Sequence, residues 1–549
     1  MLLQPADDSF DLQVLGVISG PVDGYLLPSP SPDQLGFVVT IDGLEQSTIW
    51  RLPASRGPAE PMMQVPGSLV GGVWFDSEAL VLGVNQILGG STSSGIIVDL
   101  PQRSWKRIWS VSDTSIDQIL LYSPRSKLVI VSTNASGQHR LGWALVGDPT
   151  VQFPETLHRP GFVRGALALD DRGERLLVHE VAGAISRLLL HTPTDDRVEV
   201  LAGPPGRIWA PVSWAGDLVR FRLSTPCHPP TLATVRLGTT VRLGTQTWWS
   251  VSRDHRPENP PLGSLQVECD GAELIELNGP AGPIETIVYG GPDWRQREHL
   301  VVALHGGPLS AWRFEYQPLF HCLSAAGVAI VAPNYRGSTG YGEEHQRAVI
   351  GSWGGPDLAD VLDLGRSLAK DRGSHQLLGP VVLGVSYGAF LALLAACQEP
   401  QLWSACVALA PFLSGERFHE NASVPARRRI EHLGGLRRIE DAIGTRDVLR
   451  ACAALSAPLL LMHGVEDQTI PVEQSRTLRR RLLELGRTEG VDFDYVEVDC
   501  DHSGLVAGQR KELNQQVVRF CLTRSGLRRN RQIGSPLSGA DAGQSLFPQ

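Results

Sequence analysis

The chain has 549 residues, of which 42% are hydrophobic and 19% are charged, and its formal net charge is -9. This length exceeds what one hydrophobic core usually supports, so we expect a soluble globular protein of at least two domains. The acidic balance argues against a nucleic-acid-binding surface, because that affinity rests on Lys and Arg neutralising phosphates.

The N-terminus and the cysteines bear on localisation and redox chemistry. The start, "MLLQPADDSFDLQVLG", lacks the basic region of a signal peptide. No apolar run approaches the ~20 residues of a membrane span. The eight cysteines lie far apart, without a Cys-x-x-Cys pair. We therefore expect a cytoplasmic protein with free thiols, no membrane contact, no metal and no other cofactor.

The first 250 residues contain a repeat. A polar turn followed by a short apolar run recurs, and each run is followed by a second strand-like run. The first apolar residues of the five units are spaced by 43, 48, 48 and 42 residues: Phe37, Leu80, Leu128, Leu176 and Leu218. This period, without helical patterns between the runs, predicts a β-propeller of about 4 to 8 blades. Further blades within 9–24 or 238–256 stay an open alternative. A β-sandwich is disfavoured because it requires no such period.

A proline-rich stretch, "RDHRPENPPLG" (253–263), separates this region from a different pattern. Beyond it, continuous apolar strands alternate with amphipathic helices, which indicates a mostly parallel sheet covered on both faces. The expected organisation is a propeller over 1–256, an α/β domain with a doubly wound sheet over 257–524, and a disordered tail over 525–549.

The segment "VVLGVSYGAF" (381–390) contains a Gly-x-Ser-x-Gly pentad centred on Ser386. With 58 glycines in 549 residues, chance could supply such a pentad. Its setting is more informative, because an apolar strand (380–385) meets a helix (387–397) at Ser386, as a nucleophile elbow requires. Gly384 and Gly388 would then permit the tight turn. A small-residue turn that only packs is the alternative.

A nucleophilic serine needs a base and an acid that follow it in the chain, each on a loop after a strand. His502 is the only one of 15 histidines beyond residue 467, and it follows the strand-like run "FDYVEVD". The favoured acid is Asp467, in the loop after "PLLLMHG" and 35 residues before His502. Glu466 is the local rival, and Asp501 is a weaker one.

Two other loops that follow strands offer candidates for the oxyanion donors and for the substrate pocket. "LHGGP" (304–308) ends a strand with two glycines whose backbone N–H groups are unobstructed. Gly307, together with the N–H of Tyr387 directly after the serine, would form the oxyanion hole. The loop after "ACVALAPF" brings Phe412 and Phe418 forward as pocket candidates, although apolar residues there are as easily core.

Four blocks of the sequence stand out: "HGGP", "NYRGSTGYG" with "GSWGGPDLADV", "GVSYGAF", and "HGVEDQTIP" with "DHSG". Together they resemble the prolyl oligopeptidase family of serine peptidases, and in particular its acylaminoacyl-peptidase and dipeptidyl-aminopeptidase branch. The resemblance implies an N-terminal propeller before an α/β-hydrolase domain. It also implies the triad Ser386, Asp467 and His502, with oxyanion donors on Gly307 and Tyr387.

The sequence departs from the family pattern at three positions near the site, and it also departs in the number of propeller blades. Val385, Ala389 and Asp501 stand where the family usually has glycine. Asp501 either raises the basicity of His502 or is simply solvated. Five blades are visible, whereas family propellers usually have seven or more.

These features predict a serine peptidase that hydrolyses amide bonds of short or N-acylated peptides. An esterase or acyl transferase acting on a dedicated small molecule is the first alternative. A non-catalytic propeller that binds a partner is the second. The expected partner is a short peptide or small acyl substrate, and a homo-oligomer formed through edge strands stays open.

Overall fold

The structure is a computed structural model that describes residues 2–532 except 7–8, 14–22, 43–45, 55–56, 89–91, 149, 160, 202–204, 238–247, 252–270 and 509. The chain divides into two compact units. One comprises Met1–Ala182, Ser186–Leu223 and Thr231–Asp254, and the other comprises Gly183–Ile185, Ser224–Pro230 and His255–Gln549. Each unit is described by itself.

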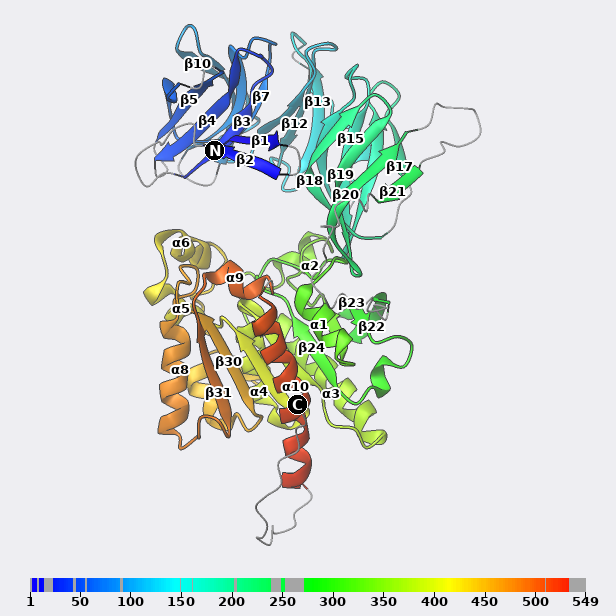
Figure 1. Cartoon of the computed structure of the whole chain (residues 1–549), viewed down its shortest axis with the longest axis vertical. Helices are drawn as coiled ribbons and strands as arrows, with labels where there is room; N and C mark the ends of the chain where they lie inside the picture. The colour runs from blue at the N-terminus through cyan, green and yellow to red at the C-terminus, as the bar shows by residue number, and fades with distance from the viewer. Residues whose placement is uncertain are drawn as a thin grey trace. The chain divides into compact units, whose positions relative to one another are not determined.

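The first unit is all-β and consists of small antiparallel sheets in chain order (Figure 1). A hairpin of β1 (Leu2–Ala6) and β2 (Ser9–Gln13) comes first. Five larger sheets follow in the described residues. They are β3 (Asp23–Pro28) to β6 (Glu60–Pro66), β7 (Ser68–Trp74) to β10 (Ser104–Trp109), β11 (Gln118–Tyr122) to β13 (Arg140–Leu145), β14 (Val163–Leu169) to β17 (Arg197–Leu201), and β18 (Arg207–Ala215) to β21 (Trp248–Val251).

The inner strands of these sheets explain the repeat in the sequence. They are β4 (Gln34–Asp42), β5 (Gln46–Pro53), β8 (Val81–Leu88), β9 (Thr92–Asp99), β12 (Leu128–Thr133), β15 (Leu176–Ala182), β16 (Ile185–Thr192), β19 (Leu218–Thr225) and β20 (His228–Arg236). The five repeat positions fall on or directly before β4, β8, β12, β15 and β19, which is the second strand of each sheet. Most side chains in the middle of these strands are buried, as Phe37 at 1% exposure illustrates.

The predicted fold class is confirmed, with a propeller-like N-terminal region and an α/β domain. Of the two stretches where further blades were considered, residues 14–22, 238–247 and 252–256 lie outside the described residues. Strand β21, within 238–256, completes the fifth sheet instead of starting another. Residues 9–13 pair only with β1 in the first hairpin, among the described residues.

The second unit is built on an eight-stranded sheet in the order β22-β23-β25-β24-β26-β27-β30-β31. The strands are β22 (Glu273–Gly279), β23 (Gly282–Tyr289), β24 (Leu300–Leu304), β25 (Ala329–Pro333), β26 (Val381–Val385), β27 (Ala405–Leu409), β30 (Leu459–Gly464) and β31 (Phe493–Val498). The pairs from β25 to β31 are parallel, and β22 and β23 add an antiparallel edge. The central strands are buried throughout, as a sheet covered on both faces requires.

Helices cover both faces of this sheet (Figure 1). On one face α3 (Pro356–Ser374), α4 (Tyr387–Gln398) and α8 (Glu473–Glu484) contribute to one core cluster. On the other face α1 (Pro318–Ala325), α9 (His502–Val506) and α10 (Lys511–Gln532) contribute to a second. Shorter elements are α2 (Glu343–Arg347), α5 (Gly415–Asn421), α6 (Val424–His432), α7 (Val448–Ala451), the hairpin β28 (Glu440–Asp441) and β29 (Gly444–Thr445), and four 3-10 turns at Glu155–Leu157, Trp294–Gln296, Pro400–Leu402 and Cys452–Ala454.

The structure describes only part of the segments predicted as a linker and as a disordered tail. The proline-rich stretch 253–263 lies outside the described residues. Helix α10 continues to Gln532, so residues 525–532 are helical and do not belong to a disordered tail. The remainder of the expected tail, 533–549, lies outside the described residues.

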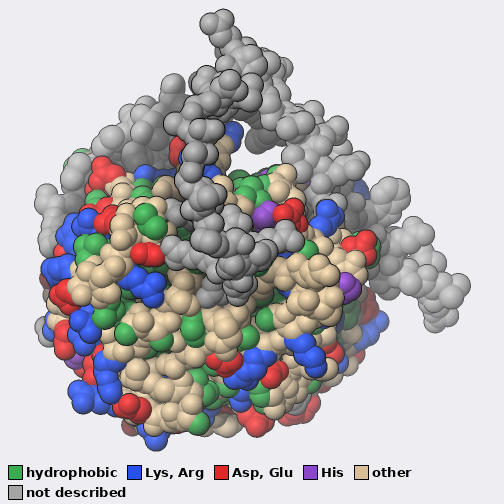
Figure 2. Space-filling view, turned by 90° about the horizontal axis from the view of Figure 1, so that it is seen from below, with side chains coloured by type: hydrophobic (Ala, Val, Ile, Leu, Met, Phe, Trp, Pro, Cys, Tyr) green, Lys and Arg blue, Asp and Glu red, His purple; other side chains and the backbone are tan. Residues whose placement is uncertain are grey.

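The charges on the surface shown in Figure 2 are mixed, and the described helices are not of the membrane-spanning type. On the face shown in Figure 2, Lys and Arg side chains are interspersed with Asp and Glu. Within the described parts of the chain, no helix combines the length and the apolar character needed to cross a membrane.

Candidate active site

Ser386 stands at a sharp turn between β26 and α4. Its φ is 56° and its ψ is -119°, a strained conformation that a side-chain-bearing residue adopts rarely. Its N–H donates to Leu409 O at 2.8 Å. A Cβ on Gly384 would lie 2.0 Å from Gly388 O, and one on Gly388 would lie 2.3 Å from Leu304 O. Both glycines are therefore required by close backbone contact, as expected from the sequence.

The structure brings Ser386, Asp467 and His502 together. His502 Nδ1–H donates to Asp467 Oδ2 at 2.6 Å, and His502 Nε2 lies 3.2 Å from Ser386 Oγ. Asp467 is 6% exposed, whereas Glu466 and Asp501 are exposed. Of the three acids that the sequence offered, Asp467 is therefore the one that contacts the imidazole.

Several donors converge on Asp467. Its Oδ1 accepts the N–H groups of Thr469 at 2.9 Å and Ile470 at 2.8 Å, and His463 Nε2 lies 3.5 Å from its Oδ2. Burial works against the charge on this carboxyl, but hydrogen bonds from His463 and His502 outweigh it. The pKa of Asp467 is therefore held well below its usual range, and the group stays ionised.

The side chain of His463 holds the loop that carries Asp467 in place from within the core. It is fully buried on β30, its Nε2–H donates to Ile470 O at 2.9 Å, and its Nδ1 lies 2.7 Å from Ser475 Oγ on α8. In the sequence His463 and Ser475 carry no signal of this role, because the strand and helix patterns mark them only as interior positions. The contact with the acid becomes visible only when β30, its loop and α8 are assembled.

The glycines after β24 lie against the serine. A Cβ on Gly306 would be 3.5 Å from Ser386 Cβ, and Gly307 follows with φ 149°. The preceding His305 is buried and stacks on Tyr335, with ring centroids 4.2 Å apart. Its Nε2 lies 2.7 Å from Ser338 Oγ, and burial lowers the pKa of His305 to about 4, so the ring is neutral. This packing holds the glycine turn beside Ser386.

The two pocket candidates lie in the core instead of lining open space. Phe412 is 2% and Phe418 is 8% exposed, and their rings stack with centroids 5.0 Å apart. Phe412 also stacks on Phe390 at 4.6 Å, and it lies 6.0 Å from the ring of Tyr387. The sequence could not separate these two situations, since both present apolar residues after a strand. In the structure they form the aromatic layer behind Tyr387.

Asp501 has a structural partner. It is the N-cap of α9, and its side chain accepts the N–H of Gly504 at 2.7 Å. Its carboxylate thereby orders the first turn of the helix that begins with His502. Val385 and Ala389, the other departures from the family pattern, are buried at the end of β26 and in α4.

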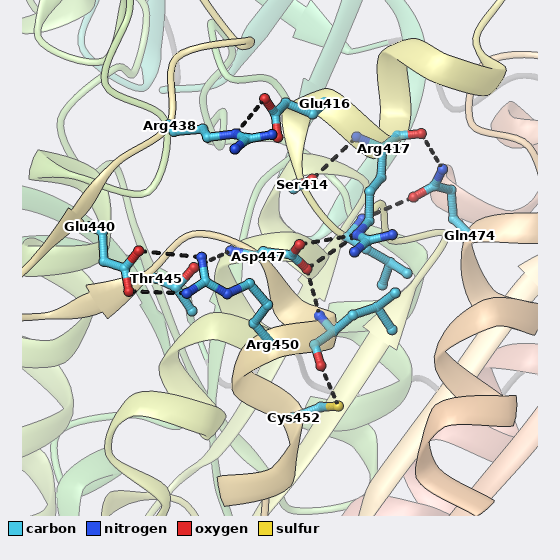
Figure 3. A network of polar contacts seen from close by, with 12 residues as sticks. Ser414, Glu416, Arg417, Arg438, Glu440, Thr445, Asp447, Arg450, Cys452 and Gln474 are labelled. Atoms are coloured by element: carbon cyan, nitrogen blue, oxygen red, sulfur yellow. Dashed lines mark hydrogen bonds and ion pairs between the residues drawn. The ribbon is translucent and has the colours of Figure 1, made fainter. Parts of the chain in front are cut away.

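A polar network holds the segment between β27 and β30 (Figure 3). Arg417, which follows Ser414 at the start of α5, pairs with Asp447 at 3.1 Å. The backbone O of Arg417 accepts from Gln474 of α8 at 2.8 Å. Asp447 in turn accepts the Leu449 N–H and caps α7. These contacts fix the segment that carries Phe418.

No described group of three or more His, Cys, Asp or Glu side chains is arranged to hold a metal ion. The contacts of His502 with Asp467 and Ser386 provide a hydroxyl beside a hydrogen-bonded imidazole and carboxylate. That arrangement serves nucleophilic attack on an acyl carbon.

The sequence is similar to a known family of enzymes. Residues 312–527 match the profile described as the prolyl oligopeptidase family, peptidase S9. The human acylamino-acid-releasing enzyme is 26% identical over 302 residues, which is 51% of this chain and 39% of that enzyme. The uncharacterized peptidase YuxL of Bacillus subtilis is 31% identical over 222 residues, 39% of this chain and 33% of that protein. The chain thus spans well under two thirds of either relative.

Solved structures extend the likeness to the whole fold. A puromycin-hydrolyzing peptidase of Mycobacterium tuberculosis superposes with a TM-score of 0.69 at 18% identity, over 91% of this chain and 78% of that one. A puromycin hydrolase reaches a TM-score of 0.69 at 17% identity, over 98% and 83%. At such identities these structures show a shared fold.

Proposed function

The α/β domain belongs to the prolyl oligopeptidase family of serine hydrolases, and from that premise we propose that this chain hydrolyses amide bonds of short or N-acylated peptides through an acyl-enzyme on Ser386. One observation carries the proposal. His502 contacts Asp467 at 2.6 Å through one ring nitrogen and Ser386 at 3.2 Å through the other. The strained backbone of Ser386 supports it, because such strain is common at nucleophile elbows.

In the proposed reaction, Ser386 Oγ attacks the substrate carbonyl carbon while its proton moves to His502 Nε2. Asp467 keeps the other imidazole proton on Nδ1 and stabilises the imidazolium that forms. The tetrahedral intermediate then expels the amine, which takes the proton from Nε2. A water molecule repeats the sequence on the acyl-enzyme and releases the acid. The cycle requires no cofactor.

We assign the oxyanion hole to the backbone N–H groups of Gly307 and Tyr387. Tyr387 is the first residue of α4, where backbone N–H groups have no partner within the helix. Gly306, next to Gly307, lies against Ser386. Donors of this kind act on charge that develops in the transition state, and losing one typically costs roughly 10²- to 10³-fold in rate.

The substrate class is proposed from the relatives and from the chemistry. Relatives named acylamino-acid-releasing enzymes favour N-acylated amino acid amides as first substrates. The puromycin-hydrolysing structures add puromycin as a probe with an aminoacyl amide bond. In each of these substrates the scissile bond joins an acyl carbon to an amine, as the proposed cycle requires.

A matched substrate panel tests the proposal. The purified chain is assayed on N-acetylated and free aminoacyl amides, on puromycin, and on esters with the same acyl groups, with Ser386→Ala as the blank. We expect amide cleavage that the blank lacks. Turnover of the esters alone, or acyl transfer to an added amine without amide hydrolysis, would instead establish the esterase or acyl-transferase alternative.

Covalent labelling separates an enzyme from a binding protein. A fluorophosphonate probe should label the wild type at Ser386 and leave Ser386→Ala unlabelled. His502→Ala should label far more slowly, because the serine loses its base. A wild type that is not labelled would support the non-catalytic alternative.

A further inference from the structure

The side chain of Tyr387 is anchored deep in the α/β domain, although its backbone is next to the nucleophile. Tyr387 is 1% exposed. Its hydroxyl donates to Asp357 Oδ2 at 2.5 Å and lies 3.3 Å from the N–H of Gly354. Asp357 is in the first turn of α3 and is fully buried. One residue thus joins Ser386 at its backbone end to a buried carboxylate at its phenol end.

The ring between these two ends is held in place by aromatic neighbours. Trp353 meets it edge-on, with centroids 5.5 Å apart at 87°. Phe390 and Phe412 lie 5.8 Å and 6.0 Å away. Closely packed interiors transmit small displacements. Any shift of the phenol is therefore passed along the rigid ring to the Cα and N–H of Tyr387.

The carboxylate of Asp357 is costly to bury. Its hydrogen-bond partners include the Tyr387 hydroxyl and the backbone N–H groups of Leu358 and Gly354, and within the described part of the chain it forms no ion pair. Asp360, one turn further along α3, is also buried but pairs with Arg336 at 2.6 Å. Burial raises the pKa of Asp357 to about 6, against those hydrogen bonds.

A buried carboxylate without a counter-ion is usually less favourable than an apolar residue of the same size. Fold stability therefore does not explain Asp357, and its contact with Tyr387 supplies a different explanation. We propose that Asp357 is a positioning residue, whose hydrogen bond to the Tyr387 hydroxyl keeps the Tyr387 N–H aimed at the oxyanion. This inference rests on the proposed function, since it presumes acyl chemistry at Ser386.

The test removes the anchor while preserving the core. In the double variant Asp357→Leu/Tyr387→Phe both polar partners are replaced by apolar groups of similar shape, which is often nearly neutral for stability. We expect the variant to fold with a melting temperature near that of the wild type, because removing a buried charge offsets the loss of an acceptor for the N–H groups of Leu358 and Gly354. We also expect kcat to fall by roughly 10- to 100-fold, as for other residues that support a site indirectly. KM should change little.

Binding of a tetrahedral adduct isolates the oxyanion hole. A peptide aldehyde forms such an adduct with Ser386, whereas a substrate bound to the Ser386→Ala background does not. The double variant should bind the aldehyde more weakly by the factor lost in kcat, and the substrate equally well. The single variant Asp357→Asn keeps an acceptor for the Tyr387 hydroxyl, and its kcat should stay close to that of the wild type. Asp360→Asn, the matched control on α3, should lower stability and leave the ratio of the two affinities unchanged.

The outcomes distinguish failure of the proposed role of Asp357 from failure of the proposed function. If the wild type cleaves amides and the stable double variant retains its kcat and aldehyde affinity, the role of Asp357 is refuted while the proposed function stands. Equal losses for aldehyde and substrate would also refute it, because they indicate a general distortion of the site. A wild type that neither cleaves substrates nor reacts with a fluorophosphonate refutes the proposed function, and this inference with it.

Discussion

Replacing Asp467 with Asn tests the proposed triad most directly. Oδ1 of Asp467 accepts the N–H groups of Thr469 and Ile470 at 2.9 Å and 2.8 Å. The Asn oxygen should stay on that side, because turning the amide would leave buried N–H groups unpaired at a cost of about 1 to 3 kcal/mol each. The Asn NH2 group then faces His502 Nδ1 and donates to it. The imidazole must carry its proton on Nε2, where it cannot accept the proton of Ser386.

The expected loss follows from this tautomer change. The equivalent substitution in a serine protease lowers kcat by about 10⁴, which corresponds to about 5.5 kcal/mol of activation free energy. Steady-state kinetics on the best amide of the panel, with melting curves to establish folding, measures it. Glu466→Gln is the matched control, since Glu466 is the adjacent exposed acid and should keep wild-type kinetics. A folded Asp467→Asn variant within roughly tenfold of wild type, a loss of only ~1.4 kcal/mol, would refute the assignment.

Three further predictions concern the packing and the pH-dependent stability of the α/β domain. Gly388→Ala places a methyl group 2.3 Å from Leu304 O and should cost about 1 to 3 kcal/mol in unfolding experiments, whereas Gly373→Ala in α3 meets nothing within 4 Å and should be neutral or stabilising. Arg372→Lys should cost about 1 to 3 kcal/mol by the same measurement, because the buried guanidinium donates to four backbone carbonyls and an ammonium cannot reach them all. Folding raises the pKa of Asp357 from the ordinary ~3.9 to about 6, so the folded state holds a proton that the unfolded state has already lost. The contribution of Asp357 to wild-type stability should therefore fall by ~2 kcal/mol as pH rises from 4 to 7, and Asp357→Asn should lack this component, which urea titrations across that range would detect.

The repeat in the N-terminal half was predictable because each blade reuses one local pattern. A turn followed by a buried strand imposes the same alternation every time, and the five positions fall on equivalent strands. The first eight residues of the expected tail were misjudged for an equally local reason. Residues 525–532 are polar and rich in arginine, so they suggest disorder, yet they continue the helix that began at Lys511.

The candidate site shows where sequence patterns lose information. Ser386, Asp467 and His502 were singled out because each follows a strand of a parallel sheet, and strand ends meet at one edge. Asp357 and His463 carry no comparable signal. Asp357 lies 30 residues before Tyr387, and its role depends on how the first turn of α3 packs against α4. Phe412 and Phe418 show the converse, since apolar residues after a strand fill a core as readily as a pocket.

The helix that follows the nucleophile has consequences for redesign. From Tyr387 to Cys397 every residue of α4 is buried, so the helix has no solvent-facing side to vary. A mutagenesis library meant to change the substrate range should leave these eleven positions fixed. The exposed residues of α5 and α6 tolerate change more readily, because their segment is tied down by the polar contacts of Figure 3. The rigid helix would then serve as the constant part of the catalyst, and the segment after β27 as its adjustable part.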